Sequence, residues 1–446
     1  MAFQNVKMKM TNTRIIAISF ALVILVGALL LCTPFASASG SWTNPVDALF
    51  TATTATCVTG LVVVDTAAHW SLFGQIVILI LIQLGGIGFM TLITLFSFFV
   101  HRQVSLHERR LLLQSVGSLQ MSGVMATFRQ ILIGTFLMEG LGAALLSIRF
   151  YPMYGSKGIW YAVFHSVSAF CNAGLDLFGA EGSASLSAFR NDPLVSGVIM
   201  MLIVMGGLGF LVWDDLMRNF FRPRRLRLHT KMVLCTTGAL LLGGWVLLFI
   251  TEYNHAFAGM SFGERLMASL FQSVTTRTAG FYTVDQTALS DSGALASICL
   301  MFVGGSPGST AGGIKTTTML IFVLSILRFS RNRETVIFGK RRIENRIVRQ
   351  AGAVVGVYLF MALLATLLIS AMEDAAFLDV LYETVSAVAT VGLSRNLTPT
   401  LCIGSKLVLI LLMYAGRLGG LSLFLALGET AKPEPLKRPV EKVLIG

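Results

Sequence analysis

The sequence has little charge for its length. Asp, Glu, Lys and Arg make up 13% of its 446 residues, whereas about a quarter is usual for soluble domains. Hydrophobic residues account for 55%, and the mean hydropathy is +0.77. Several runs approach or pass the roughly 20 apolar residues that a bilayer-crossing helix needs. They are Ile15–Cys32, Phe73–Val100, Leu194–Val212, Met232–Ile250, Ala294–Val303 with Met319–Leu327, Ala351–Ala371 and Leu407–Leu427. This composition excludes an ordinary soluble domain and predicts an all-α polytopic membrane protein.

The sequence also lacks the motifs of common enzymes and metal sites. No GxSxG, HExxH, Walker or Rossmann pattern occurs, and the six histidines have no ligand spacing. The six cysteines are scattered and never form a CxxC pair. They are Cys32, Cys57, Cys171, Cys235, Cys299 and Cys402. We therefore expect no enzyme activity, no catalytic residue, no resident metal and no organic cofactor.

The net charge of +12 is concentrated in a few segments. Basic residues cluster in His101–Arg110, Arg218–Lys231, Arg328–Arg349 and the tail from Lys432, whereas the other connections carry few. The positive-inside rule places such loops, and both termini, in the cytoplasm. We therefore predict a multi-pass protein of the cytoplasmic membrane, surrounded by lipid, and no nucleic-acid partner.

The segment "PFASASG" after Cys32 has the small-residue spacing of a signal-peptidase site. The apolar run before it, Ile15–Cys32, is long for the core of a signal peptide. We therefore expect this run to remain as the first membrane span, with cleavage as the alternative.

One short pattern recurs four times along the chain. The copies are "LFTATTATCVTGL" (Leu49–Leu61), "VFHSVSAFCNAGL" (Val163–Leu175), "LFQSVTTRTAGF" (Leu270–Phe281) and "LYETVSAVATVGL" (Leu381–Leu393). Each begins with an apolar and an aromatic residue, continues through Ser, Thr and Ala, and reaches a glycine. A second glycine cluster follows each copy, at Gly85–Gly86, Gly206–Gly207, Gly304–Gly305 and Gly416. Each unit therefore resembles a span, a short half-crossing segment, a glycine turn and a second span.

Turns at membrane depth must be buried in protein or line water, because lipid cannot hydrogen-bond their backbone. Glycine can adopt the left-handed dihedrals that turn successive carbonyl groups one way. A ring of such carbonyls can replace the hydration shell of an ion, and helices whose carboxyl ends point at the centre favour a cation. The alternative is that the small residues only let helices pack closely. Four aligned copies favour the ion pathway.

These four motifs resemble those of the Trk/Ktr/HKT superfamily of potassium-uptake proteins, and most of all its KtrB-type membrane subunits. The resemblance spans all four repeats and implies a selectivity filter in each. The filter residues would be Val58, Thr59 and Gly60; Asn172, Ala173 and Gly174; Thr278, Ala279 and Gly280; Thr390, Val391 and Gly392. Only the fourth copy reads TVG, and none has the second glycine of TVGYG. The family implies potassium as the transported ion, allows sodium as a second one, and suggests a homodimer that binds a cytosolic RCK ring of the KtrA type.

Three carboxylates follow the first three turns, namely Asp65, Asp176 and Asp285. On the outer side of a filter they would raise the local cation concentration. The fourth copy has Ser394 and Arg395 at this place, so such an outer ring would be incomplete. The alternative for each is an ordinary solvated loop acid.

The stretch "GGSPGSTAGGIKTTT" interrupts the second span of the third repeat. Proline in a helix interior costs about 3 kcal/mol and glycine about 1 relative to alanine, so we predict an unwound segment here and not a simple kink. The resemblance implies an intramembrane gate. Its residues would be Gly304, Gly305, Ser306, Pro307, Gly308, Ser309, Thr310, Ala311, Gly312 and Gly313.

Arg417 lies about ten residues into the last span, where a charge costs about 2.5–3.5 kcal/mol. Its distance from Gly392 predicts the same depth as the gate segment, so it would resist cations or hold that segment by its carbonyl groups. The alternative is a structural arginine paired with an acid such as Glu139. Arg277 would repel cations at the axis, so we expect it to point away, toward Glu383 or Asp379. Lys315 stays ambiguous between the inner vestibule and the membrane surface.

The resulting hypothesis is four repeats of M1, pore helix and M2, with eight transmembrane helices and four re-entrant helices around one pseudo-fourfold pathway. The expected divisions are residues 1–118, 119–228, 229–346 with the gate loop, and 347–446 with the tail. The predicted function is potassium uptake through a channel-like, sodium-assisted filter with an intramembrane gate and a cytosolic regulator. The alternative is a secondary cation carrier with alternating access, although carriers usually contain two inverted repeats.

Overall fold

The computed structural model describes residues 12–88, 124–219, 222–333 and 335–419. These segments are helical apart from connecting loops and one small hairpin, β1 (Ile337–Phe338) with β2 (Arg341–Arg342). The prediction of an all-α membrane fold with pore-helix repeats is confirmed. Parts of two predicted spans, the basic loop at 101–110 and the tail from Lys432 lie outside the described residues.

Four long helices form the first member of each repeat, and we call them M1. They are α1 (Asn12–Cys32), α7 (Val124–Tyr154), α11 (Leu228–Glu252) and α15 (Asn345–Met372). Among the described residues, four helical segments are long and apolar enough to cross a membrane, and each lies in one of these helices. Their exposed residues are largely Leu, Ile, Val and Phe, as expected for helices whose outer surface faces lipid.

The second and third members of each repeat are shorter. The pore helices are α2 (Pro45–Thr56), α8 (Ser156–Cys171), α12 (Phe262–Thr275) and α16 (Phe377–Ala389). The M2 helices are α4 (Leu72–Ile87), α9 (Pro193–Leu208) with α10 (Phe210–Asn219), α13 (Asp291–Met301) with α14 (Thr316–Phe329), and α17 (Ile403–Leu418). Short turns connect them: α3 (Thr66–His69), η1 (Gly179–Glu181), η2 (Ser187–Phe189), η3 (Pro223–Arg225), η4 (Gln286–Ala288) and η5 (Thr398–Thr400).

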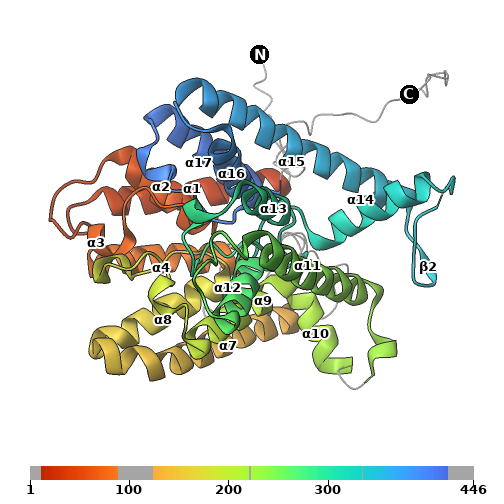
Figure 1. Cartoon of the computed structure of the whole chain (residues 1–446), viewed down its shortest axis with the longest axis horizontal. Helices are drawn as coiled ribbons and strands as arrows, with labels where there is room; N and C mark the ends of the chain where they lie inside the picture. The colour runs from red at the N-terminus through yellow and green to blue at the C-terminus, as the bar shows by residue number, and fades with distance from the viewer. Residues whose placement is uncertain (1–11, 89–123, 220–221, 334, 420–446) are drawn as a thin grey trace, which may run out of the picture.

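The repeats are arranged in a closed cycle. Within each repeat M1 contacts both the pore helix and M2, and in repeats 1, 2 and 4 the pore helix also contacts M2. Between repeats, the M2 helix of one packs against the pore helix of the next: α4 with α8, α9 with α12, α13 with α16, and α17 with α2. The last contact closes the ring, so the blue repeat 4 lies beside the red repeat 1 in Figure 1. The four pore helices are thereby surrounded by M1 and M2.

Within the described residues, the helix of each M2 segment ends at a comparable place. Helices α4, α9 and α17 end at Gly88, Gly209 and Gly419, which have φ values of 88°, 91° and 80°. The chain bends by 97° between α9 and α10, and in repeat 3 it leaves the helix between α13 and α14. Sequence analysis predicted a break only in the third repeat. The other three helix ends coincide with glycines of positive φ, which ordinary helix continuation does not allow.

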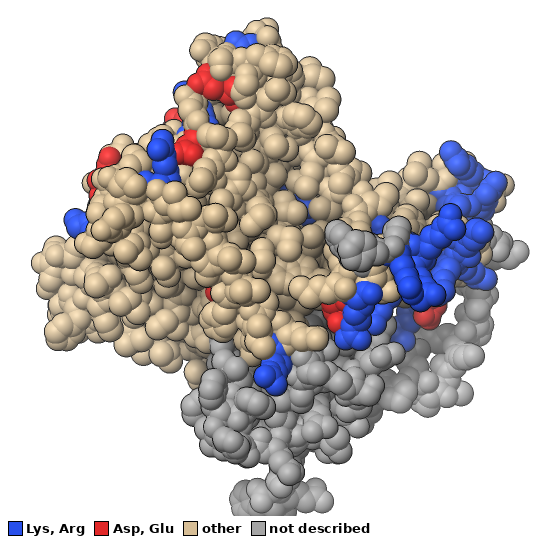
Figure 2. All heavy atoms as spheres, turned by 90° about the horizontal axis from the view of Figure 1, so that it is seen from below, with Lys and Arg blue, Asp and Glu red and all other residues tan. Residues whose placement is uncertain are grey.

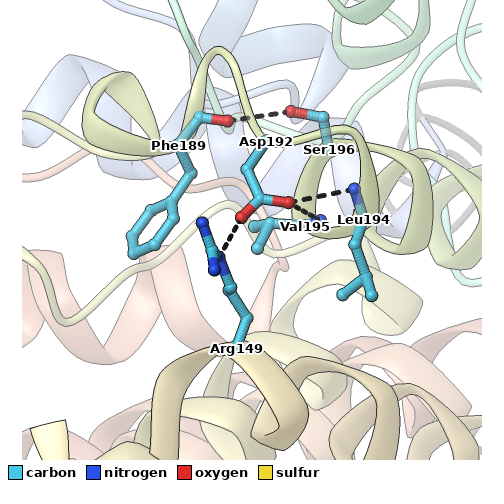
Figure 3. Close-up of polar contacts among 6 residues, drawn as sticks. All are labelled: Arg149, Phe189, Asp192, Leu194, Val195 and Ser196. Carbon is cyan, nitrogen blue, oxygen red and sulfur yellow. Dashed lines mark hydrogen bonds and ion pairs between the residues drawn. The ribbon is translucent and has the colours of Figure 1, made fainter. Parts of the chain in front are cut away.

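Ionic contacts fix the outer starts of the M2 helices. Figure 3 shows Asp192 capping α9: its Oδ1 accepts from the amides of Leu194 and Val195 at 3.0 and 3.3 Å. Its Oδ2 lies 2.5 Å from Nε of Arg149 on α7. The carboxylate therefore satisfies free amides of the helix start and ties M2 to M1 of the same repeat.

Basic side chains gather at one end of the molecule. Figure 2 shows Lys and Arg concentrated there, at the end that carries α14 and the hairpin in Figure 1. The exposed residues on this segment include Arg331, Arg333, Lys340, Arg341 and Arg342. This is the third of the basic loops on which the sequence-based topology depended.

Candidate functional site

The four repeated turns share one backbone conformation. The residue two before each glycine, which we call the first filter position, lies in the left-handed region. The φ values are 54° at Val58, 60° at Asn172, 67° at Thr278 and 52° at Thr390. The filter glycines also have positive φ: 100° at Gly60, 68° at Gly174, 80° at Gly280 and 89° at Gly392. Because non-glycine residues adopt such angles at a cost of about 1–3 kcal/mol, their recurrence in four unlike sequences indicates one selected loop geometry.

The filter glycines meet around a common centre. A Cβ atom on each would collide with the carbonyl oxygen of the residue before the next repeat's glycine. The contacts are Gly60 with Ala173 at 2.6 Å, Gly174 with Ala279 at 2.6 Å, Gly280 with Val391 at 2.8 Å, and Gly392 with Thr59. The order runs through repeats 1, 2, 3, 4 and back to 1. The structure therefore brings the twelve predicted filter residues together as one ring of loops, in which only glycine fits at the narrowest point.

One hydroxyl on each pore helix holds the loop that follows it. We call Thr54, Ser168, Thr275 and Ser386 the pinning residues. Their carbonyl oxygens accept from the amide of the residue before the filter glycine, at 2.9, 2.7, 3.0 and 2.8 Å. Their side-chain hydroxyls bind backbone groups further along the same loop. The amides of Gly60 and Gly392 donate to the hydroxyls of Thr54 and Ser386 at 2.9 and 3.1 Å.

The other two pinning hydroxyls donate to the carbonyl oxygen just after the glycine. Ser168 bonds Leu175 at 2.7 Å, and Thr275 bonds Phe281. Sequence analysis noted Ser and Thr in every copy but did not assign them this role. Their constant offset of four residues from the aromatic was the available signal.

A second set on the pore helices anchors the chain beyond the filter in three repeats. Nε2 of His165 accepts from the amide of Leu177 at 3.4 Å. The amides of Gln272 and Gln286 exchange hydrogen bonds at 2.6 and 3.2 Å. Glu383 accepts from the hydroxyl of Thr398. The pore-helix residues His165, Gln272 and Glu383 each directly follow the aromatic residue of their copy. They therefore lie on the equivalent face of their pore helices and hold equivalent parts of the outer loops.

The predicted gate segment lies against one end of the filter. Residues 302–315, the 302–315 loop, connect α13 to α14 without helix, as predicted from Pro307 and the glycines. The loop folds back on itself through Gly304 N to Ile314 O at 2.9 Å, and it docks on α9 through Ser306 N to Gly207 O at 3.0 Å. The Thr310 hydroxyl donates to Phe170 O, at the end of a pore helix, at 3.0 Å. We call the filter end beside this loop its inner end.

Arg417 joins three broken segments. Its guanidinium donates to the carbonyl oxygens of Thr310 in the 302–315 loop and of Gly85 in α4, and to Gly86 O at 3.4 Å. The arginine and the loop therefore do share one depth. The alternative of an Arg417–Glu139 pair is wrong, because Glu139 accepts from Nε2 of Gln83 at 3.0 Å instead.

The three predicted outer carboxylates converge beyond the other end of the filter. Burial raises the pKa of Tyr282 to about 12, and the charges of Asp176, Asp285 and Asp65 add to this rise. Asp65 and Asp285 also cap the short turns α3 and η4. In the fourth repeat Nε of Arg395 lies 2.9 Å from Oδ1 of Asp379, so its charge is balanced locally.

Two ambiguous charges now have partners. Arg277 points to M1 of its own repeat, where its guanidinium donates to the hydroxyl of Thr237 at 3.5 Å. The expected partners Glu383 and Asp379 were wrong, because they bind Thr398 and Arg395. Lys315 bends back into the 302–315 loop, where its ammonium donates to Ala311 O at 2.7 Å.

Comparisons with known proteins agree over the whole chain. The family model of the TrkH cation transport proteins matches residues 3–432. The "Potassium/sodium uptake protein NtpJ" of Enterococcus hirae is 38% identical, covering 99% of both chains. The "Ktr system potassium uptake protein B" of Bacillus subtilis is 38% identical over 98% of this chain and 97% of its own. The crystal structure of TrkH from Vibrio parahaemolyticus shares the fold, with a TM-score of 0.74 at 17% identity over 96% of this chain and 86% of that one.

The pinning hydroxyls predict a graded loss of stability. Ser386→Ala leaves the buried amide of Gly392 without its acceptor, which costs about 1–3 kcal/mol. Ser386→Thr keeps the hydroxyl, and Thr54 and Thr275 show that threonine fits this position. We expect a lower unfolding midpoint of the purified protein for the alanine variant than for the threonine variant. Equal midpoints in both would contradict the pinning role.

Asp176 predicts a pH dependence of stability. Burial, with a smaller contribution from the Asp65 carboxylate, raises the pKa of this carboxyl to about 7, against a hydrogen bond from the Phe178 amide that lowers it. Because the unfolded value is about 4, the folded protein binds the proton more tightly, and stability falls as the pH rises from about 4 to about 7. We therefore expect Asp176→Asn to gain stability relative to the parent between these pH values.

The matched control is Asp65→Asn, which keeps an N-cap for α3. Without the Asp65 charge, the pH range in which Asp176→Asn gains stability should shift downward. Thermal melts across pH, with and without this second change, measure both effects. A stability difference that does not vary with pH would contradict the assignment.

Proposed function

The chain belongs to the TrkH family of cation transport proteins, and on this premise we propose that it takes up potassium ions through the ring of four filter loops. The observation that carries this proposal is the cyclic contact of each filter glycine with the carbonyl group of the next repeat. A ring of carbonyl oxygens can replace an ion's water shell. The carboxyl ends of four pore helices add negative dipole charge at the same centre. Similar proteins are named for potassium uptake, or for potassium and sodium uptake.

The filter has one glycine per repeat, which limits the number of coordinating rings. A TVGYG filter contains two glycines, which orient its carbonyl groups over a longer stretch of backbone. Each loop here contains a single filter glycine and then continues into an outer loop. Fewer rings discriminate less between ions of different size. We therefore propose that potassium is preferred but sodium also enters, as a second permeant or assisting ion.

We place the gate in the 302–315 loop with Arg417. The loop contacts α9 and the end of a pore helix at the inner end of the filter, and in this proposal it closes the way toward the cytoplasm. Arg417 fastens it to α4 and places a positive charge below the filter. Opening would require the loop to leave these contacts. The domain divisions of the sequence analysis remain a proposal that this arrangement supports.

The basic end of the molecule supports a cytoplasmic location for that surface, since positive loops stay inside. We propose a cytoplasmic-membrane protein with both termini in the cytoplasm. Relatives named as part of a Ktr system support a cytosolic partner, proposed as a nucleotide-binding RCK ring of the KtrA type, and a homodimer of the membrane subunit. The exposed arginines around β1 and β2 would offer the docking charge.

The function is tested by rubidium-86 uptake into proteoliposomes loaded with potassium, with potassium and sodium as external competitors. We expect potassium to block uptake more strongly than sodium. Gly392→Ser should weaken this preference or stop transport, because its Cβ would collide with Thr59 O and the adjacent Gly60 backbone. The control is Gly356→Ser on α15, where a Cβ meets nothing within 4 Å.

Other outcomes would favour the alternative carrier. Uptake that saturates, depends on a proton or sodium gradient and is the same in Gly392→Ser would exclude the pore. Uptake lost equally in Gly392→Ser and Gly356→Ser would indicate a folding defect and remove the support for the filter.

The proposed gate predicts an effect on the rate of ion uptake that is separate from any effect on ion preference. Arg417→Gln removes the charge and the guanidinium hydrogen bonds that tie Thr310 of the 302–315 loop to α17 and α4. Each hydrogen bond from a charged group contributes about 1.5 kcal/mol or more. We expect rubidium uptake to rise by up to roughly tenfold with the potassium preference kept. Arg149→Gln is the control, since this arginine binds Asp192 far from the loop. An unchanged rate in Arg417→Gln would remove the gate role.

A further inference from the structure

We propose that Arg277 determines how tightly the filter holds a cation. Its buried positive charge, fixed behind the third filter loop, weakens cation binding, so that ions leave the filter quickly. The residue lies outside the twelve filter positions and outside the proposed gate. The inference rests on the proposed potassium uptake through the four loops, and it concerns a charge that acts on the ion from a distance.

The position directly before the first filter position carries a charge in one repeat only. Its residues are Cys57, Cys171, Arg277 and Ala389. All four are buried: the two cysteines and the alanine are 0% exposed, and Arg277 is 6% exposed. The loops that follow have the same left-handed φ at the first filter position, between 52° and 67°. A small uncharged residue therefore suffices for this loop conformation, and the folding of the loop alone does not account for an arginine in repeat 3.

Contacts between α12 and α11 direct the Arg277 side chain toward M1. Oγ of Ser273 on α12 donates to the carbonyl oxygen of Leu241 on α11 at 2.8 Å. Four residues further along the chain from Ser273, and four residues back in α11, the Arg277 guanidinium donates to Oγ1 of Thr237 at 3.5 Å. The second contact continues the antiparallel register of the first. The guanidinium is therefore held between the third filter loop and M1.

The charge of Arg277 has no acidic partner among the described residues. The ion pairs of that part of the chain do not include it, and its Nε has no hydrogen-bond partner there. Arginine keeps its charge in proteins. A charge that is buried without an opposite charge is costly, and its field is screened by salt much less than that of a surface charge. The field of Arg277 therefore reaches the neighbouring filter.

This field opposes the dipoles of the pore helices. The carboxyl end of each pore helix carries roughly half a negative charge, and Arg277 comes two residues after α12 ends at Thr275. Because Arg277 directly precedes Thr278, its guanidinium stays on the order of 10 Å from the filter backbone even when it extends away from it. A unit charge about 10 Å from a bound ion, at an effective dielectric constant of about 20, changes the affinity for that ion roughly tenfold.

A charge at this place suits a filter that conducts. Conduction requires that a cation binds strongly enough to enter and weakly enough to leave. Three pore-helix ends attract the cation, and Arg277 offsets the attraction of the fourth. Because Arg277 binds M1 and makes no hydrogen bond to the 302–315 loop among the described contacts, its field acts on the filter whether the proposed gate is closed or open.

Removing the charge tests the inference. Arg277→Gln and Arg277→Met keep a long side chain but lose the charge, and Arg277→Lys keeps the charge. Thr237→Val removes the hydrogen bond and leaves the arginine in place. In both uncharged variants we expect the rubidium concentration for half-maximal uptake into proteoliposomes to fall roughly tenfold, with a lower maximal rate because ion release slows. Arg277→Lys and Thr237→Val should keep the half-maximal concentration of the parent protein.

Binding to the purified protein supplies the second readout. Bound rubidium raises the thermal unfolding midpoint, and at constant ionic strength this rise should begin at a roughly tenfold lower rubidium concentration in Arg277→Gln and Arg277→Met. Equal changes in all four variants would show a structural role and overturn the electrostatic one. Parent-like concentrations in both uncharged variants, with normal uptake, would overturn the inference and leave the proposed function standing. A parent protein with neither rubidium uptake nor stabilisation by rubidium would overturn the proposed function, and this inference with it.

Discussion

The structure depends on one constraint, that backbone outside a helix at membrane depth must find its hydrogen bonds within the protein. Four loops leave their pore helices there, and each is held by a hydroxyl and a carbonyl of the same pinning residue. The carbonyl group before each filter glycine lies against the filter glycine of the neighbouring repeat. The loops are therefore fixed at a point where a Cβ atom on the glycine would collide with backbone, and carbonyl oxygens are the groups that line this contact.

The same constraint explains the arginine in the last M2 helix. The carbonyl groups of Gly85 and Gly86 lie in the last turn of α4, and that of Thr310 lies in the non-helical 302–315 loop. Arg417 supplies donors to all three from a third helix. A guanidinium has five N–H groups in a fixed plane, so it can serve several carbonyls at once. The carbonyl groups stabilise the buried charge of Arg417, and Arg417 supplies their hydrogen-bond donors. Removing either partner leaves the other without these hydrogen bonds.

Sequence patterns predicted the backbone better than the side-chain contacts. The four glycine turns, the unwound segment and the depth of Arg417 follow from spacing, because periodicity and helix breakers act locally. The predicted partners of Arg277 were wrong because one hydroxyl, that of Thr398, binds Glu383 and one cation, Arg395, binds Asp379 once the repeats pack. The helix ends at Gly88, Gly209 and Gly419 were not predicted either. A single glycine is tolerated in most helices, and its sequence does not reveal the positive φ that ends the helix there.

A single chain allows the four repeats to differ where a tetramer of identical subunits could not. The backbone at the first filter position is the same in all four, yet its side chains are Val58, Asn172, Thr278 and Thr390. Likewise, three outer loops carry an acid near Tyr282 and the fourth carries Arg395. The shared backbone geometry therefore fixes the positions of the carbonyl groups in all four loops. The side chains differ between repeats, so one repeat can be changed by substitution while the backbone of the others stays in place.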